Sequence, residues 1–328
     1  MKKNIISKKS DLLLIKFPIW IPILYLILSR LDEVMFLPTL ILFLFLGELH
    51  FGSTYGFFFD KNYRSQFKNN IYIYLVMPIL ILLFCIFIGF YFSISAVLFL
   101  ILLFNFFHVN RQSIGVFRLF NKLNDKKFKL IFETLIYFFS FGFCLIGLLK
   151  FVFKSELFFN YQVQIFIISN FLILLSLFVL ILLMFLKERI VLDCIFTYLT
   201  GILIFYPVFL TDNLIEVFAM GVGMHYIQYI GLTWSIFQRK SQRNVSPDKN
   251  FNYFAKLRNI VIILFIYSIL MILCSNLNLN YNDEKIGIYL IPVFFQLIHF
   301  YIDMFIWRFS DNHTRENLIP FLFSKNAS

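Results

Sequence analysis

Apolar runs of about 20 residues recur along this chain, and they restrict its fold more than any other feature. A run of that length spans a bilayer as a helix. Inside lipid, every backbone polar group must be satisfied within the protein, so only helices and closed barrels can cross. The runs are continuous and do not alternate between polar and apolar residues, which favours helices. The chain is therefore predicted to be an all-α, polytopic membrane protein.

The composition agrees with this prediction. Hydrophobic residues make up 60% of the 328 residues and charged residues only 14%, against roughly 25% in typical soluble domains. The net charge of +11 would suggest nucleic acid as a partner of a soluble protein. Here the basic residues lie between apolar runs and no nucleic-acid motif is present, so no nucleic-acid partner is expected. The four cysteines are scattered without the spacing of a zinc site or a disulfide framework.

About ten spans are predicted, at residues 11–29, 34–59, 70–91, 94–117, 129–152, 162–186, 190–210, 213–237, 257–276 and 286–308. The first span lacks a small-residue cleavage site and is expected to be an uncleaved anchor. Pro18 and Pro22 predict a kink within it. We find no internal repeat, linker or soluble domain. The prediction is a single transmembrane domain over 1–328, with a basic cytoplasmic N-terminus at 1–10 and a cytoplasmic tail at 309–328.

The distribution of lysine and arginine predicts the orientation. With the N-terminus in the cytoplasm, nearly all loop lysines and arginines fall on the cytoplasmic side. The opposite side receives only Arg30, Lys150, Lys154 and Lys285. Because basic residues are retained on the cytoplasmic side, this asymmetry supports both termini inside, in the inner or plasma membrane of the cell.

Four of the five histidines interrupt the apolar runs. They occur in "GELHFGSTYG" (His50), "NFFHVNRQSIG" (His108), "GVGMHYIQYIG" (His225) and "QLIHFYIDMFIWR" (His299). In the predicted topology their four helices are parallel, and each histidine lies nine to fourteen residues before the next cytoplasmic charge. At 1.5 Å per residue this is a depth of roughly 14–21 Å. The four side chains are therefore predicted to share one layer of the membrane, whereas His313 lies in the polar tail and is expected to be solvated.

Each of these histidines has polar neighbours on its own helix face. Residues three or four positions apart share a face, and ionisable groups inside a membrane usually mark function. The neighbours are Thr54 after His50, Arg111 and Gln112 after His108, Gln228 after His225 and Asp303 after His299, while Glu48 lies two residues before His50. Three explanations stay open: a shared metal or cofactor site, a proton or ion pathway, and hydrogen bonds that join helices.

A metal site gives each of these residues a role. Imidazole is neutral when it binds a metal and suits iron, copper, zinc and nickel, so the four intramembrane histidines are the candidate metal ligands. Asp303 and Glu48 are candidate catalytic residues that would orient an imidazole or bind the ion directly. Arg111, also assigned to the catalytic set, would compensate one of these acids. Gln112 and Gln228 are the candidate cofactor-binding residues.

The pieces "LHFG" around His50 and "MHYIQYIGL" around His225 resemble the Brp/Blh family of membrane β-carotene dioxygenases. That resemblance implies a multi-pass protein that holds a non-haem iron on histidines and cleaves a carotenoid with dioxygen. It implies His50, His108, His225 and His299 as the iron ligands. The chain departs from the family in its first histidine motif and in having no second histidine four residues after His225.

The leading hypothesis is a membrane-embedded metal-dependent oxygenase that acts on an apolar, lipid-soluble substrate. One alternative is a bis-histidine haem protein, in which the four histidines supply two axial pairs. The other is a proton-coupled or ion transporter, in which the same polar layer relays protons or binds the transported solute.

Overall fold

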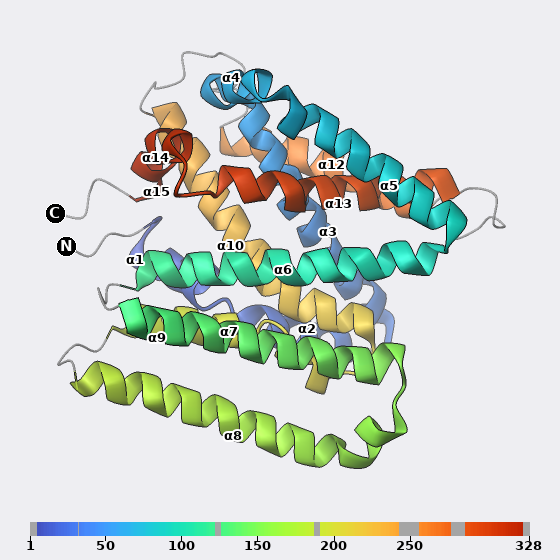
Figure 1. Cartoon of the computed structure of the whole chain (residues 1–328), viewed down its shortest axis with the longest axis vertical. Helices are drawn as coiled ribbons and strands as arrows, with labels where there is room; N and C mark the ends of the chain where they lie inside the picture. The colour runs from blue at the N-terminus through green and yellow to red at the C-terminus, as the bar shows by residue number, and fades with distance from the viewer. Residues whose placement is uncertain are drawn as a thin grey trace. The chain divides into compact units, whose positions relative to one another are not determined.

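All regular structure in the described part of the chain is helical, and it contains no strand (Figure 1). The structure is a computed structural model that describes residues 5–31, 33–121, 126–186, 191–242, 256–276 and 286–323. The main helices are α2 (Trp20–Leu31), α3 (Glu33–Tyr55), α5 (Met77–Tyr91), α6 (Ile94–Phe120), α7 (Lys126–Gly147), α8 (Glu156–Leu186), α9 (Leu192–Leu203), α10 (Leu214–Gln242), α12 (Leu257–Asn276) and α13 (Ile286–Ile306).

Shorter helical segments complete the fold. They are α1 (Lys8–Ser10), η1 (Asp11–Lys16), η2 (Gly56–Phe59), α4 (Lys61–Asn69), η3 (Tyr72–Val76), η4 (Leu148–Val152), η5 (Tyr206–Phe209), α14 (Asn312–Asn317) and α15 (Ile319–Leu322). Each of the ten predicted spans coincides with helical structure, so the all-α prediction is confirmed. The short helices α4, α14 and α15 lie in segments that were predicted to be a loop and a tail.

Fewer helices than predicted are long and apolar enough to cross a membrane. Four such stretches occur among the described residues, at Ile41–Phe59, Tyr72–Tyr91, Lys127–Val152 and Phe158–Leu186. A fifth results if Lys8–Lys16 and Trp20–Leu31, bent by 67°, form one span. About ten spans are therefore not found among the described residues. The polar side chains of α10 lower its hydropathy, α9 is short, and the apolar stretches of α12 and α13 that the structure describes are also short.

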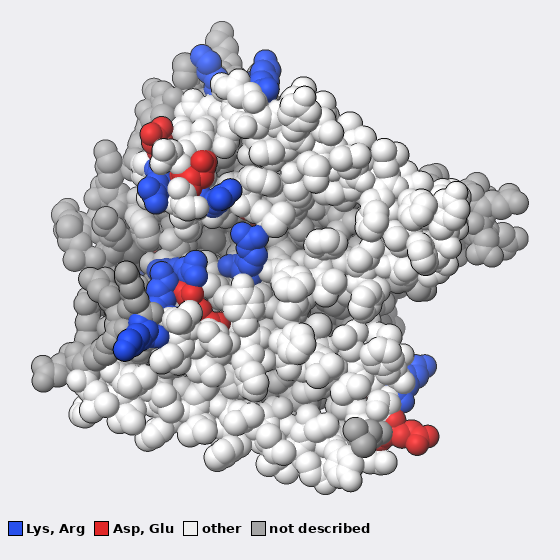
Figure 2. Space-filling model, viewed as in Figure 1, with Lys and Arg blue, Asp and Glu red and all other residues white. Residues whose placement is uncertain are grey.

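The long apolar helices present uncharged surfaces. In Figure 2 the visible surface over α5 and over the middle of α8 carries no Lys, Arg, Asp or Glu side chain. Large apolar side chains are exposed along both, for example Leu83 and Phe90 on α5 and Phe171 and Phe178 on α8. Exposed apolar areas of this extent are unfavourable in water. These helices are therefore suited to a lipid environment, as the sequence predicted.

The chain divides into two compact units, each described by itself. Unit 1 comprises Met1–Ser7, Phe45–Asn105 and Tyr229–Ser328, and unit 2 comprises Lys8–Leu44 and Phe106–Gln228. In unit 1, α13 packs against α5 and α12. In unit 2, α9 packs against η1, α7 and α8. The single transmembrane domain predicted from the sequence stays a prediction.

In unit 1, α3 and α12 approach closely at Gly52. A Cβ atom added to Gly52 would lie 2.9 Å from both Leu264 Cδ2 and Tyr267 Cδ1, closer than side chains tolerate. Glycine is the residue that permits this approach. The tight contact between α3 and α12 therefore explains why glycine stands at this position.

A buried ion pair connects several helices of unit 1. Lys240, near the C-terminus of α10, bonds to Asp60, and both side chains are almost fully buried. Asp60 also caps α4, because its Oδ1 accepts from the backbone N–H of Asn62 at 3.0 Å. The ammonium of Lys240 lies 4.9 Å from the centre of the Tyr63 ring and 5.4 Å from that of Phe321. This pair thereby joins α4, α10 and the C-terminal helices.

In unit 2 the bent N-terminal segment is held by two polar contacts: an ion pair of Lys16, and a hydrogen bond of 2.8 Å that Thr200 Oγ1 donates to the carbonyl of Lys16. Lys16, at the end of η1, is buried and forms a 2.8 Å ion pair with Asp193 of α9. The break before α2 includes Pro18, which confirms the predicted kink. Around these contacts, aromatic and aliphatic side chains of α6, α7, α9 and α10 form the buried apolar core of unit 2.

Candidate functional site

A cluster of buried polar side chains lies inside unit 1, where three helices contribute to it. His50 and Thr54 are one turn apart on α3, His299 and Asp303 are one turn apart on α13, and Tyr229 comes from α10. The i, i+4 spacing turns each helical pair toward the same side. His50, Thr54, Tyr229 and His299 are 0% exposed, and Asp303 is 5% exposed. We call these five residues the histidine–carboxylate cluster.

The aromatic rings of the cluster are in direct contact. The ring centres of His50 and His299 are 4.4 Å apart, and those of His50 and Tyr229 are 4.5 Å apart. Tyr229 and His299 are 5.5 Å apart by the same measure. All three pairs are steeply inclined, so ring edges meet ring faces and no two imidazoles stack flat. Two imidazoles from separate helices therefore point into one buried volume.

The hydroxyl of Thr54 is the hub of the hydrogen bonds in this cluster. Thr54 Oγ1 lies 2.7 Å from Nδ1 of His299 and donates to Oδ1 of Asp303 at 2.8 Å. It also lies 2.5 Å from the hydroxyl of Tyr229. Tyr229 in turn donates to the same carboxylate oxygen at 2.7 Å. One threonine thus connects α3 to both α10 and α13.

This network favours one tautomer of His299. A hydroxyl has one proton, and when Thr54 donates it to Asp303, the hydroxyl accepts from His299. The proton of the neutral imidazole then sits on Nδ1, and the lone pair sits on Nε2. A hydrogen bond to one ring nitrogen usually sets which nitrogen of a histidine binds a metal. The network therefore leaves the lone pair of Nε2 available to bind a metal ion.

Asp303 presents its second oxygen on the same side as this nitrogen. Asp303 Oδ2 lies 3.9 Å from Nε2 of His299, and it accepts no hydrogen bond from the described residues. Two imidazoles and one carboxylate are the donor set that binds non-haem Fe(II) in many oxygenases, where other positions stay open. The cluster thus contains both the ligand types and the supporting hydroxyl groups of a metal site.

Unit 2 contains the other two of the four candidate histidines as a second pair. His108 of α6 and His225 of α10 have ring centres 5.1 Å apart and planes at 89°. His225 is fully buried and His108 is half-buried. The sequence predicted all four histidines to bind one ion. Each unit by itself brings two of them into contact, and the binding of one ion by all four stays a prediction.

The remaining predicted site residues differ in their surroundings. Nε2 of Gln228 donates to the carbonyl of Ile15 at 2.6 Å, so this amide holds η1. Gln112 has buried amide atoms without a hydrogen-bond partner among the described residues, and the same is true of Glu48 Oε2. Arg111 is exposed, whereas the prediction required it to compensate a buried acid.

Tyr229 and Trp307 were not among the site residues predicted from the sequence. Tyr229 lies four residues after His225, and Trp307 lies four residues after Asp303, so helical spacing was the available signal. In the structure the indole N–H of Trp307 donates to the hydroxyl of Tyr229 at 3.3 Å. It therefore extends the hydrogen bonds of the cluster.

No protein-family model, curated protein or solved structure matches this chain. The family resemblance of the two histidine motifs accordingly stays a prediction.

Proposed function

We propose that this chain is a membrane protein that binds a transition-metal ion on intramembrane histidines and uses it to oxidise a lipid-soluble substrate. The observation that carries the proposal is the histidine–carboxylate cluster of unit 1. Ionisable and imidazole groups are costly within an apolar helical protein, so a functional role explains why they are kept. A cluster that only joined helices would not need two imidazoles in contact beside a carboxylate.

His50, His299 and Asp303 are the ligands we assign in unit 1. Imidazole and carboxylate donors suit iron better than they suit soft ions such as Cu(I), which prefer thiolate and thioether ligands. We propose non-haem iron as the metal, in line with the family resemblance. The bound ion would supply dioxygen binding and activation. Thr54 and Tyr229 would hold the carboxylate and imidazole in place, and the apolar helices would admit the substrate from the bilayer.

The class of substrate follows from the environment and from the resemblance. Exposed apolar side chains along α5 and α8 favour an apolar compound dissolved in the membrane. A carotenoid is the substrate that the resemblance implies. We further propose that the protein is multi-pass in the inner or plasma membrane, with its termini in the cytoplasm, because basic residues gather on that side.

A haem is less compatible with the observed pairs. A porphyrin bound by two axial histidines lies between their rings. The ring centres are only 4.4 Å apart in one pair and 5.1 Å apart in the other, and this leaves no room for a macrocycle. An absorption spectrum of the purified protein tests this directly, since a Soret band would support haem and its absence is expected here.

Metal analysis tests the proposal. The protein is purified without chelators, loaded with Fe(II) under anaerobic conditions, and its metal content is measured by mass spectrometry. We expect stoichiometric metal in the wild-type protein and in His313→Ala, a control outside the apolar helices, and a large loss in His299→Ala. A wild-type protein without stoichiometric metal would refute the proposal.

The same measurement decides the role of the second pair. We propose, from the shared depth of the four histidines in the sequence, that His108 and His225 belong to the same centre. One ion per chain that is lost in both His299→Ala and His108→Ala supports this. Two ions per chain, each lost with one pair only, would assign a separate centre to each unit. Unchanged metal content in His108→Ala would remove His108 and His225 from the site.

A further inference from the structure

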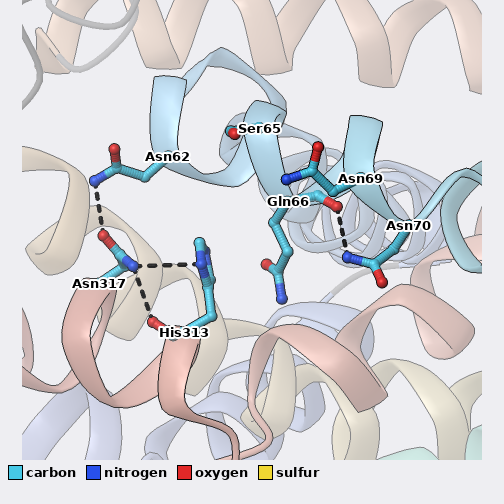
Figure 3. Close-up of a pocket in the computed structure, with 7 residues that line it drawn as sticks. All are labelled: Asn62, Ser65, Gln66, Asn69, Asn70, His313 and Asn317. Carbon is cyan, nitrogen blue, oxygen red and sulfur yellow. Dashed lines mark hydrogen bonds between the residues drawn. The ribbon is translucent and has the colours of Figure 1, made fainter.

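A polar pocket lies between α4 and α14 in unit 1, apart from the histidine–carboxylate cluster (Figure 3). Its volume is about 350 Å³, within the roughly 300–1,000 Å³ that is usual for small-molecule sites. Its lining contains no lysine, arginine, aspartate or glutamate. The lining residues are Asn62, Ser65, Gln66, Asn69, Asn70, His313 and Asn317.

The sequence of α4, "KNYRSQFKN", separates three kinds of side chain onto three helix faces. Successive residues of a helix are about 100° apart, so positions three, four and seven apart share a face. The basic residues Lys61, Arg64 and Lys68 form one stripe. Tyr63 and Phe67 form a second, which is buried. The amide and hydroxyl residues of the pocket lining form the third, and this stripe faces α14.

Hydrogen bonds hold the pocket walls in place. Asn62 Nδ2 donates to Oδ1 of Asn317 at 2.7 Å and thereby ties α4 to α14. Asn317 Nδ2 donates to the carbonyl of His313 at 3.1 Å. The ring of His313 meets the ring of Tyr63 edge-on at 4.9 Å. Figure 3 shows the side chain of Gln66 reaching from α4 into the space between the two helices.

The chemistry of the lining determines which ligand fits. Without a basic residue the pocket is poorly suited to phosphate or carboxylate, and without an acid it is poorly suited to a cation. Carboxamides both donate and accept hydrogen bonds, and so do the hydroxyl groups of a sugar. The basic stripe of α4 lies beside the amide stripe and is attracted to anionic lipid at a membrane surface. In a membrane-bound protein this stripe would hold the pocket near the lipid headgroups.

We propose that this pocket binds a neutral polyhydroxyl group, either a free sugar or the sugar headgroup of a neutral glycolipid. The binding groups are the amides of Gln66 and Asn69 together with the imidazole of His313. The bond between Asn62 and Asn317 sets the separation of the two walls. This site is independent of the metal site, because it shares no residue with the histidine–carboxylate cluster.

Binding of methyl β-glucoside to the full-length protein tests the inference. The protein is kept in a polyoxyethylene detergent, which carries no sugar, and binding is measured by saturation-transfer NMR. We expect saturable binding that is about fivefold weaker in Gln66→Leu and in Asn69→Leu, since each loses a hydrogen bond of the kind that contributes about 1 kcal/mol. Gln238→Leu, which removes an exposed amide of α10 outside the pocket, is the control and keeps wild-type affinity.

A second arm separates the two sources of the sugar. The protein is reconstituted into nanodiscs of phosphatidylcholine with and without monoglucosyl diacylglycerol, and enrichment of the glycolipid around the protein is measured. Binding of the free glucoside supports a soluble sugar as the ligand. A lipid headgroup is supported if the free glucoside does not bind and the glycolipid is enriched around wild type but not around Gln66→Leu. Absence of both signals, or equal signals in the pocket variants and wild type, would overturn the proposal. All three variants change half-buried or exposed positions, and thermal denaturation confirms that they fold.

Discussion

Replacing Thr54 by valine removes the hub of the histidine–carboxylate cluster and changes little else. Valine has nearly the shape of threonine, so the packing of this fully buried position is retained. The Nδ1–H of His299 then loses its acceptor, and Asp303 keeps only the hydrogen bond from Tyr229. A buried polar group left without a partner costs about 1–3 kcal/mol. We therefore expect the free energy of unfolding to fall by about 2 kcal/mol.

The effect on metal binding is the more specific expectation. Removing a group that orients a ligand typically weakens metal affinity by about 10–100-fold. Thr54→Val should therefore bind Fe(II) about 10–100-fold more weakly than wild type in a competition titration with a chelator. Thr54→Ser keeps the hydroxyl and loses one buried methyl group, which costs about 1 kcal/mol of stability. It should keep metal affinity close to that of wild type.

Nitrogen NMR of the metal-free protein with labelled histidine provides a readout that does not depend on the metal. In wild type the proton of His299 is expected on Nδ1, and in Thr54→Val this preference should be lost. If valine and serine weaken metal binding equally, the hydroxyl is not what orients the ligand. If Thr54→Val loses stability but keeps wild-type metal affinity, His299 is not a ligand. Either outcome refutes the assignment.

Three further predictions concern stability, measured by thermal denaturation in detergent. Gly52→Ala should lower the free energy of unfolding by about 1–3 kcal/mol, because the added Cβ would meet two side chains at 2.9 Å. The control is Gly115→Ala, whose Cβ would meet nothing within 4 Å, and it should be neutral or stabilising. Lys240→Met should lower the free energy of unfolding by about 3–5 kcal/mol, because it leaves Asp60 buried without its partner. Adding Asp60→Asn to this variant should recover much of the lost stability. A Lys240→Met protein as stable as wild type would contradict the prediction. Burial lowers the pKa of His313, so the unfolded chain takes up the proton first as pH falls through about 6.5, and stability should decrease from there toward lower pH. His313→Gln should show a smaller decrease, and an equal one would disprove the assignment.

Several features of the fold could be predicted because they depend on local sequence. The continuous apolar runs predicted helices at the positions where helices occur, since a chain in lipid must satisfy its backbone within each segment. Pro18 predicted the break before α2 for a similarly local reason. The number of membrane-crossing helices was overestimated. Hydropathy was judged from apolar runs alone, whereas polar residues within a helix such as α10 lower the mean over the length needed to cross.

The candidate site was predicted only as far as helical spacing reaches. The i, i+4 relation placed Asp303 on the face of His299 and Thr54 on the face of His50, and both relations are observed. Spacing could not reveal that the two faces meet, nor that Tyr229 joins them. Arg111 illustrates the converse, because its spacing from His108 suggested burial and its side chain is exposed.

The sequence by itself determined the helical class, the positions of the helices and the pairs of polar residues along each helix, since these follow from periodicity and from the hydrogen bonding of a single segment. The tertiary structure decided which helix faces meet: His50 with His299, His108 with His225, and the amide stripe of α4 with α14. Rotation of a helix about its axis leaves its own hydrogen bonds unchanged, so only packing against the other helices selects the face that turns inward.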